Sequence, residues 1–225
     1  MRPDKIDVWR VDLDGEDPGG SLYASLTPDE REQARRRRSP VDGRRFGLGR
    51  ASLRVILSRY TGESARGLRL SREPRGRMIL DASSPLSFSV AHAGPVGLVA
   101  IGLARSIGVD LEPLSAAPQI ADVADHYLPG ARVATARSAP AGQQNEQWLR
   151  LWTEVEAYAK LDGRGLIDAK STEILLEARE HSVQFRPTPD HVATLVYTGR
   201  AARVTYLLFS PSAGEEPVRV ERSPG

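Results

Sequence analysis

Two segments with different hydrophobic periods constrain the fold most strongly. Residues 106–112 (SIGVDLE) alternate, with an apolar side chain at every second position, and a proline follows them. This period of two predicts a strand with one buried face, and it places Asp110 and Glu112 together on the other face near the strand's end. Residues 145–162 carry a broad apolar face with helical spacing, and Gly163 ends the pattern. The chain therefore combines strands with a long helix.

The acidic side chains of these two segments form a candidate metal site. Residues four apart share a helix face, so Trp152, Glu156 and Lys160 form one column. Asp110, Glu112 and Glu156 offer the oxygen ligands that Mg²⁺ takes together with substrate phosphates, and Lys160 can meet a phosphate oxygen. Each segment alone also fits an ordinary structure. The acids fit a solvated strand end, and Glu156 with Lys160 fits an ion pair on a helix surface.

A dense run of arginines lies upstream. Residues 31–54 hold nine arginines against two acids, although the net charge of the whole chain is only +2. Such a block can bind a nucleotide, a nucleic acid or an acidic protein, and it also fits a solvated helix face. Nucleic acid is the weaker option because no zinc finger, RNA-recognition or helix-turn-helix motif accompanies the charge.

Composition narrows the setting. The chain has no cysteine, which excludes disulfides and thiolate metal sites and favours a reducing compartment. It has no apolar run of the ~18 residues that a membrane span needs, and its first residues lack the apolar core of a signal peptide. We therefore expect a cytoplasmic protein that does not bind a membrane.

Local patterns outline the first half of the chain. Thr27, Pro28 and Glu30 predict a helix start with a capping box. A second helix is expected from Ser39–Pro40 to about Tyr60, with Phe46 among its core-facing residues. The strands expected in this half cover residues 6–13, 68–70, 78–80, 88–91 and 97–103.

The second half begins near Pro113. A weak helix is expected at residues 120–128, and the Ala-, Arg-, Pro- and Gly-rich residues 129–142 predict a loop near the site. After the long helix, a second sheet is expected from residues 173–176, 183–185, 193–197 and 203–209. Residues 210–225 hold little hydrophobic mass and predict a disordered tail.

Four ordered motifs resemble those of one family. Residues 108–112 (GVDLE) look like the G-[VI]-D-[VIL]-E motif of 4′-phosphopantetheinyl transferases. Residues 152–160 (WTEVEAYAK) resemble their W-x-x-K-E-A-x-x-K motif, and residues 163–166 (GRGL) match the G-x-G-[LF] after it. Upstream, residues 88–94 (FSVAHAG) are similar to F-[NS]-[LIV]-S-H-[ST]-x. The resemblance covers roughly residues 27–166 and is closest to the larger, monomeric, surfactin-synthetase-activating type.

The resemblance implies a fold and an activity. The fold would be α+β, with two pseudo-symmetric α+β halves at residues 1–112 and 113–209 and the active site at their junction. The activity would be transfer of 4′-phosphopantetheine from coenzyme A to a serine of an acyl or peptidyl carrier protein, which releases 3′,5′-ADP. The partners implied are coenzyme A and a carrier protein domain, and the protein would act as a monomer.

The resemblance also implies roles for particular side chains. Asp110, Glu112 and Glu156 would bind Mg²⁺, with Mn²⁺ as an alternative, and Glu156 would also act as general base. Lys160 and His92 would bind the pyrophosphate. The coenzyme-binding set would also include the arginines at positions 45, 50 and 77, with Arg45 in a basic segment (residues 44–50) that meets the 3′-phosphate. A histidine after a strand also fits a purely structural group.

The sequence departs from the family pattern at several positions. Val155 replaces a common lysine, and Ala91 and Ala93 replace hydroxyl residues beside His92. We expect Val155 to affect packing and the two alanines to remove phosphate hydrogen bonds. These departures motivate an alternative, a non-catalytic descendant that binds coenzyme A or a carrier protein. A further alternative is an unrelated Mg²⁺-dependent phosphate-handling protein whose motifs match by chance.

Overall fold

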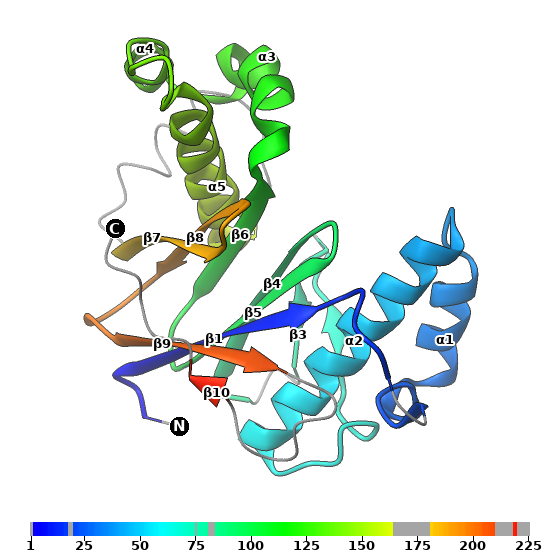
Figure 1. Cartoon of the computed structure of the whole chain (residues 1–225). Helices are drawn as coiled ribbons and strands as arrows, with labels where there is room; N and C mark the ends of the chain where they lie inside the picture. The colour runs from blue at the N-terminus through cyan, green and yellow to red at the C-terminus, as the bar shows by residue number, and fades with distance from the viewer. Residues whose placement is uncertain are drawn as a thin grey trace.

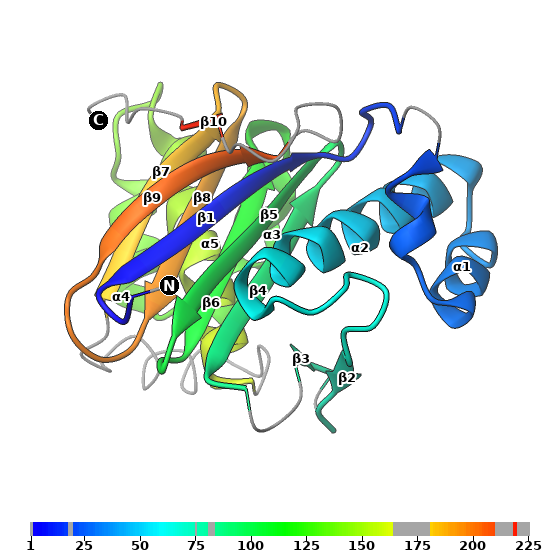
Figure 2. The same cartoon turned by 90° about the horizontal axis from the view of Figure 1, so that it is seen from below.

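The computed structural model describes residues 2–17, 20–74, 76–80, 84–163, 181–209 and 218–219. In this part of the chain four layers stack on one another (Figure 1 and Figure 2). They are helix α2 (Pro40–Thr61), a five-stranded sheet, a three-stranded sheet and helix α5 (Gln144–Asp162). Strands and helices are thus mixed in one α+β architecture, as expected from the family resemblance.

The larger sheet has the strand order β10-β9-β1-β5-β4. Its strands are β1 (Lys5–Asp12), β4 (Leu86–Ala93), β5 (Val96–Leu103), β9 (Arg203–Phe209) and β10 (Val218–Arg219). The central strand β1 runs antiparallel to β5 and parallel to β9. The expectation that residues 203–209 belong to a second sheet is therefore wrong. The strand alternation was correct, but strand order depends on contacts that are distant in sequence.

The smaller sheet has the strand order β6-β8-β7. Its strands are β6 (Ile107–Pro113), β7 (His181–Thr188) and β8 (His191–Tyr197). Because nearly all of β6 lies before residue 113 and β9 lies after it, each sheet takes strands from both predicted halves. Neither sheet is confined to residues 1–112 or 113–209, so the division into halves remains a prediction.

Capping residues that the sequence predicts mark the start of α1, both ends of α2 and the end of α5. In helix α1 (Pro28–Arg35), the Thr27 hydroxyl accepts a hydrogen bond from the Glu30 amide, and the Glu30 carboxylate accepts one from the Thr27 amide. At the start of α2, the Ser39 hydroxyl likewise accepts a hydrogen bond from the Asp42 amide. Gly62 ends α2 in the left-handed conformation. Gly163 ends α5 in the left-handed conformation too.

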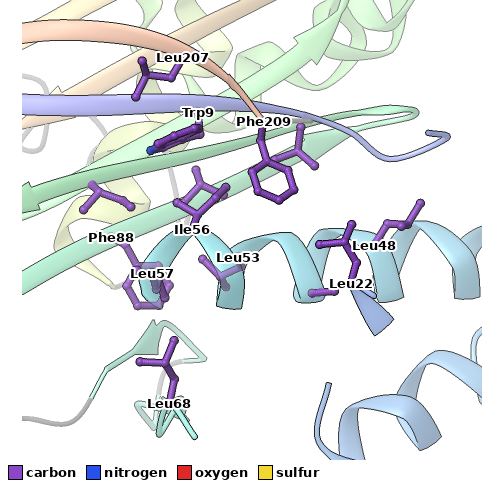
Figure 3. Packing of buried hydrophobic residues seen from close by; sticks show 14 of the residues in the cluster. Trp9, Leu22, Leu48, Leu53, Ile56, Leu57, Leu68, Phe88, Leu207 and Phe209 are labelled. Carbon is purple, nitrogen blue, oxygen red and sulfur yellow. The ribbon is translucent and has the colours of Figure 1, made fainter. Parts of the chain in front are cut away.

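Buried side chains fill the spaces between the layers. Figure 3 shows one cluster, in which Leu53, Ile56 and Leu57 of α2 pack against Trp9 and Phe88 of the larger sheet. A second cluster lies between the two sheets and a third joins the smaller sheet to its helices. The prediction that Phe46 faces the core is wrong. Phe46 is half-buried, because the arginine side chains Arg37 and Arg50 cover its ring instead of apolar residues.

Two short helices cover the outer end of α5. Helix α3 (Ala117–Tyr127) is where a weak helix was expected, but helix α4 (Gly130–Arg137) occupies the predicted loop. The loop prediction is wrong because only Val133 and Ala136 of α4 are buried, which is too little apolar surface to create a visible period.

The remaining expectations concern the edges of the fold. Strands β2 (Ser71–Arg72) and β3 (Met78–Ile79) pair with each other and are shorter than predicted, with β2 displaced along the chain. The strand expected at 173–176 lies outside the described residues. Within the predicted tail, β10 pairs with β9, and the other tail residues lie outside the described part. No described helix has the length and apolar character needed to cross a membrane.

Candidate active site

A cleft of about 510 Å³ opens between α2, β4 and the C-terminal end of α5. Cationic side chains dominate its polar lining, and Glu156 is its acid. The cations are Arg37, Arg45, Arg50, Arg72, Arg77 and Lys160, with His92 beside them. The structure thus brings six of the eight predicted site residues to one cleft, and all of the predicted coenzyme-binding residues are among them. A cleft of this size and charge suits a multiply charged anion.

The two remaining predicted residues lie on β6, directly against α5. Val109 and its apolar neighbours on β6 face the larger sheet, so Asp110 and Glu112 face the helix, as the alternation predicted. Gly108 allows the close approach. A Cβ atom at this position would lie 2.9 Å from the Ala157 carbonyl carbon and 2.8 Å from the Leu161 amide nitrogen. The glycine of the GVDLE segment is therefore needed so that the helix carrying Glu156 and Lys160 can reach the acids.

Asp110 is the most buried of the three acids. Its side chain is almost fully covered, and Lys160 Nζ donates to its Oδ1 at 2.6 Å. Its second oxygen, Oδ2, is buried and has no hydrogen-bond partner among the described residues. Burial raises the pKa of Asp110, although the ammonium of Lys160 acts in the opposite direction. A buried carboxylate oxygen without a partner is costly, which suggests that it has a ligand in the working state.

The three acids also act on one another. Burial raises the pKa of Glu112 to about 7, and the negative charges of Asp110 and Glu156 add to the effect. Burial likewise raises the pKa of Glu156, with Asp110 again contributing. Like charges held together in a partly buried site repel each other unless a cation lies between them.

The three acids have the ligand atoms that a divalent cation needs, but their side chains are not yet arranged around one metal position. The three carboxylates provide the all-oxygen ligands that Mg²⁺ or Mn²⁺ prefers, and Asp110 Oδ2 is without a partner. Within the described ranges, no group of three or more His, Asp or Glu side chains is already gathered around a metal position. One oxygen of Asp110 is instead held by Lys160.

Strand β4 joins the cleft to the acidic strand. His92 lines the cleft with its side chain exposed, and Ser89 lines it three residues earlier. The buried Ser89 Oγ accepts a hydrogen bond from the Val109 amide at 3.1 Å. This bond crosses between the two sheets, so it fixes the strand that carries His92 against the strand that carries Asp110 and Glu112.

Existing partners hold the predicted arginines in place. Arg45 donates two hydrogen bonds to Asp14, from Nε at 2.8 Å and from Nη2 at 2.7 Å. Arg50 donates to Glu30 at 3.2 Å. Arg77 donates to the Leu161 carbonyl at 3.3 Å, which links it to the end of α5. Asp14 could not have been assigned to Arg45 from sequence because the two residues are 31 positions apart.

Sequence reasoning missed several cleft residues. The arginine run that includes Arg37 fits a solvated helix face, yet the Arg37 guanidinium lies 4.2 Å from the centre of the Phe46 ring at the cleft wall. Arg72 and Ser89 also line the cleft. The sequence signal for Ser89 is its place in the FSVAHAG segment, three residues before His92.

The departures from the family pattern lie mostly in packed positions. Val155 is buried in the cluster between α5 and its covering helices, as expected for a packing role. Ala91 and Ala93 are buried between the two sheets, although Ala91 also borders the cleft. Trp152 is partly buried and makes an edge-to-face contact with Tyr127.

The geometry suits chemistry on a phosphate ester. Cations can bind anionic oxygens along the cleft, and the acids at its end can hold a cation or take up a proton. Both functions meet at α5, because Glu156 and Lys160 lie one turn apart on the face that borders the cleft.

Comparison with known proteins agrees with this chemistry. Residues 106–207 match the family described as the 4′-phosphopantetheinyl transferase superfamily. The chain is 34% identical over 181 residues to the 4′-phosphopantetheinyl transferase HetI of Nostoc sp., across 79% of this chain and 76% of that protein. It is 30% identical over 146 residues to a putative 4′-phosphopantetheinyl transferase of Synechocystis sp., across 64% of this chain and 59% of that protein.

More distant relatives come from Bacillus. The chain is 25% identical over 168 residues to the 4′-phosphopantetheinyl transferase psf-1 of Bacillus pumilus, across 75% of this chain and 70% of that protein. The family match includes both the strand with Asp110 and Glu112 and the helix with Glu156 and Lys160. The chain therefore belongs to the 4′-phosphopantetheinyl transferase superfamily, a family of transferases.

Proposed function

We propose that this protein transfers the 4′-phosphopantetheine group of coenzyme A to a serine of an acyl or peptidyl carrier protein domain and releases 3′,5′-ADP. One observation carries the proposal: three mutually repelling acids lie beside a cleft lined by arginine and lysine side chains. Coenzyme A needs such a cleft because it carries a diphosphate and a 3′-phosphate. The acids suit the transfer step, in which phosphate charge must be neutralised.

The proposed binding mode follows the charges of the cleft. Arg45 and Arg50 bind the 3′-phosphate, while Arg77, His92 and Lys160 bind the diphosphate. Asp14 holds Arg45 through Nε and Nη2, which orients the planar guanidinium before the ligand arrives. Ordering of the side chain in advance lowers the entropic cost of binding.

Asp110, Glu112 and Glu156 would hold the divalent cation, Mg²⁺ or Mn²⁺. Its chemistry is to neutralise charge on the phosphate oxygens and to polarise the phosphoryl group. Support comes from the unpartnered Oδ2 of Asp110 and from the raised pKa values of Glu112 and Glu156, which burial causes and the charge of Asp110 increases.

The protein's own residues would manage the proton and the leaving group. Glu156 accepts the proton of the serine hydroxyl while the serine oxygen forms a bond to the β-phosphorus of coenzyme A. The bond from this phosphorus to the bridging oxygen breaks, and that oxygen leaves with 3′,5′-ADP. Lys160, one turn along α5, stabilises the charge that develops on the phosphates. Burial around Glu156 raises its pKa, which makes the carboxylate a stronger proton acceptor.

The proposed working unit is one chain. All the named side chains come from a single chain, and the cleft receives residues from both sides of position 112. We accordingly propose that residues 1–112 and 113–209 are pseudo-symmetric halves that meet at this site, with the sheets exchanging β6 and β9 across the boundary.

The experiment is a transfer assay on intact carrier proteins. The protein is incubated with Mg²⁺, coenzyme A and a panel of apo carrier domains from fatty-acid, polyketide and nonribosomal-peptide synthases, and each carrier is weighed by mass spectrometry. The proposal expects the added mass of one phosphopantetheine group on at least one carrier. Coenzyme A binding without transfer to any carrier would instead favour a non-catalytic binding protein, and absence of both would refute a role in coenzyme A chemistry.

A further inference from the structure

A second basic hollow lies outside the active-site cleft. It measures about 570 Å³ and is formed by α1, the segment between α1 and α2, and the first turn of α2. Figure 1 and Figure 2 both place α1 and this end of α2 at the edge of the molecule opposite α4. Its lining includes five arginines and no acidic residue: Arg31, Arg35, Arg37, Arg38 and Arg44.

The guanidinium groups of this hollow are poorly neutralised. Arg35 reaches Glu32 and Arg44 reaches Asp14 only at 3.4 Å, and no described acidic group forms a salt bridge with Arg38. Nη2 of Arg31 donates to the Tyr23 carbonyl at 3.1 Å, whereas its buried Nε has no hydrogen-bond partner among the described residues. The like charges of the five arginines that line this hollow repel each other, so an anion bound there would relieve the repulsion and give Nε of Arg31 a partner.

The hollow is distinct from the active-site cleft although it adjoins it. Of the lining residues, Arg37 alone belongs to both, and its guanidinium stacks on Phe46 at the shared wall. The six predicted site residues of the cleft, including Lys160 and Glu156, do not line the hollow. The cleft already contains enough cations for the phosphates of coenzyme A, so the transfer reaction leaves the hollow without an assigned ligand.

We propose that this hollow is a second binding site for a compact polyphosphate anion. Planar guanidinium groups bind phosphate oxygens through paired hydrogen bonds, and several of them around one concave surface favour a ligand with adjoining phosphate groups over a single anion. A free inorganic polyphosphate and the triphosphate of a nucleotide share this chemistry. Binding here does not depend on phosphopantetheine transfer.

The test is a calorimetric titration of the full chain with inorganic tripolyphosphate at about 0.15 M salt, where weak surface attraction is screened. Three double variants are compared with the parent protein. Arg35→Ala with Arg38→Ala alters the hollow, and Arg72→Ala with Arg77→Ala alters the cleft. Arg66→Ala with Arg203→Ala removes the same charge from exposed positions outside both. Circular dichroism checks that each variant is folded.

The proposal predicts a binding event that survives in the cleft variant and in the charge-matched control, and that weakens about tenfold or more in the hollow variant. A second titration with ATP separates the sources. Equal affinity indicates that only the phosphates are recognised, whereas tighter ATP binding indicates a nucleotide. No binding at this salt concentration overturns the proposal. Binding that is lost in the cleft variant but kept in the hollow variant also overturns it. An equal loss of affinity in the hollow variant and in the charge-matched control overturns it too.

Discussion

Replacing Gly108 by alanine tests whether α5 must touch β6 for the site to form. The new methyl group would lie 2.8 Å from the Leu161 amide nitrogen and 2.9 Å from the Ala157 carbonyl carbon, and closer still to the Ala157 oxygen. Heavy atoms of this kind prefer about 3.5 Å or more, so the Leu161 nitrogen alone requires the helix backbone to retreat by roughly 0.7 Å, and the nearer Ala157 oxygen requires more. Backbone atoms cannot rotate away as a side chain can.

Two effects follow from this displacement. Overpacking of a tight interface costs roughly 1–3 kcal/mol of unfolding free energy. In a chain of 225 residues this lowers Tm by roughly 2–12 °C. Glu156 and Lys160 move away from Asp110, and a misplacement of about 1 Å can cost about 100-fold in rate. Differential scanning fluorimetry and the carrier-mass assay measure the two effects.

Gly142→Ala is the matched control, because a Cβ atom there meets nothing within 4 Å and the residue does not have a positive φ. It should leave both Tm and transfer near the values of the parent protein. If Gly108→Ala behaved like this control, the close contact between β6 and α5 would not be required, and the reasoning would be refuted.

Three further predictions follow from single contacts. Lys160→Met removes the cation beside Asp110, so it should lower kcat for transfer by about 100-fold or more. Lys160→Arg keeps the charge and should keep part of the rate. In steady-state assays, a kcat of Lys160→Met equal to that of the parent protein would contradict this. Ser89→Ala leaves the buried Val109 amide without its acceptor, so urea unfolding should show a loss of about 1–3 kcal/mol that Ser89→Thr largely restores. Burial acts to raise the pKa of Glu30, but hydrogen bonds from Arg54 and Thr27 and the charge of Arg50 lower it overall below 4.5. The stability from this pairing is therefore complete above pH 4.5 and is lost as the pH falls through the folded pKa. Unfolding free energies measured at several pH values should fall less steeply below about pH 4.5 in Glu30→Gln, and identical slopes would show that Glu30 does not contribute.

Local patterns predicted the elements that have strong local signals. The strand with Asp110 and the helix with Glu156 have clear periods, and Thr27, Ser39 and Gly163 act as the caps that their types predict. The sequence also predicted that this strand and this helix meet, because Asp110, Glu112 and Glu156 together form a candidate metal site. Its physical cause, the missing side chain of Gly108, became visible only when Ala157 was placed opposite it.

What the sequence could not predict depends on distant contacts. The pairing of β9 with β1 brings residues about 200 positions apart together, and nothing in the period of either strand encodes it. Helix α4 has two buried side chains, too few for a recognisable pattern. The partners of the arginines, such as Asp14 for Arg45 and Glu30 for Arg50, also require the folded chain. The arginines of residues 31–54 are divided between the cleft and the separate hollow, and this division also depends on how the chain folds.

The central claim is that the acids beside the cleft carry out the transfer, and Glu156→Gln tests it most directly. The control is Glu154→Gln, two residues earlier on the same helix, where the carboxylate binds Arg132 and Ser182 instead of lining the cleft. The measurement is the single-turnover rate of phosphopantetheine transfer to an apo carrier protein in the presence of Mg²⁺. The account predicts loss of transfer in Glu156→Gln and a rate close to that of the parent protein in Glu154→Gln. Equal rates in the two variants would contradict it.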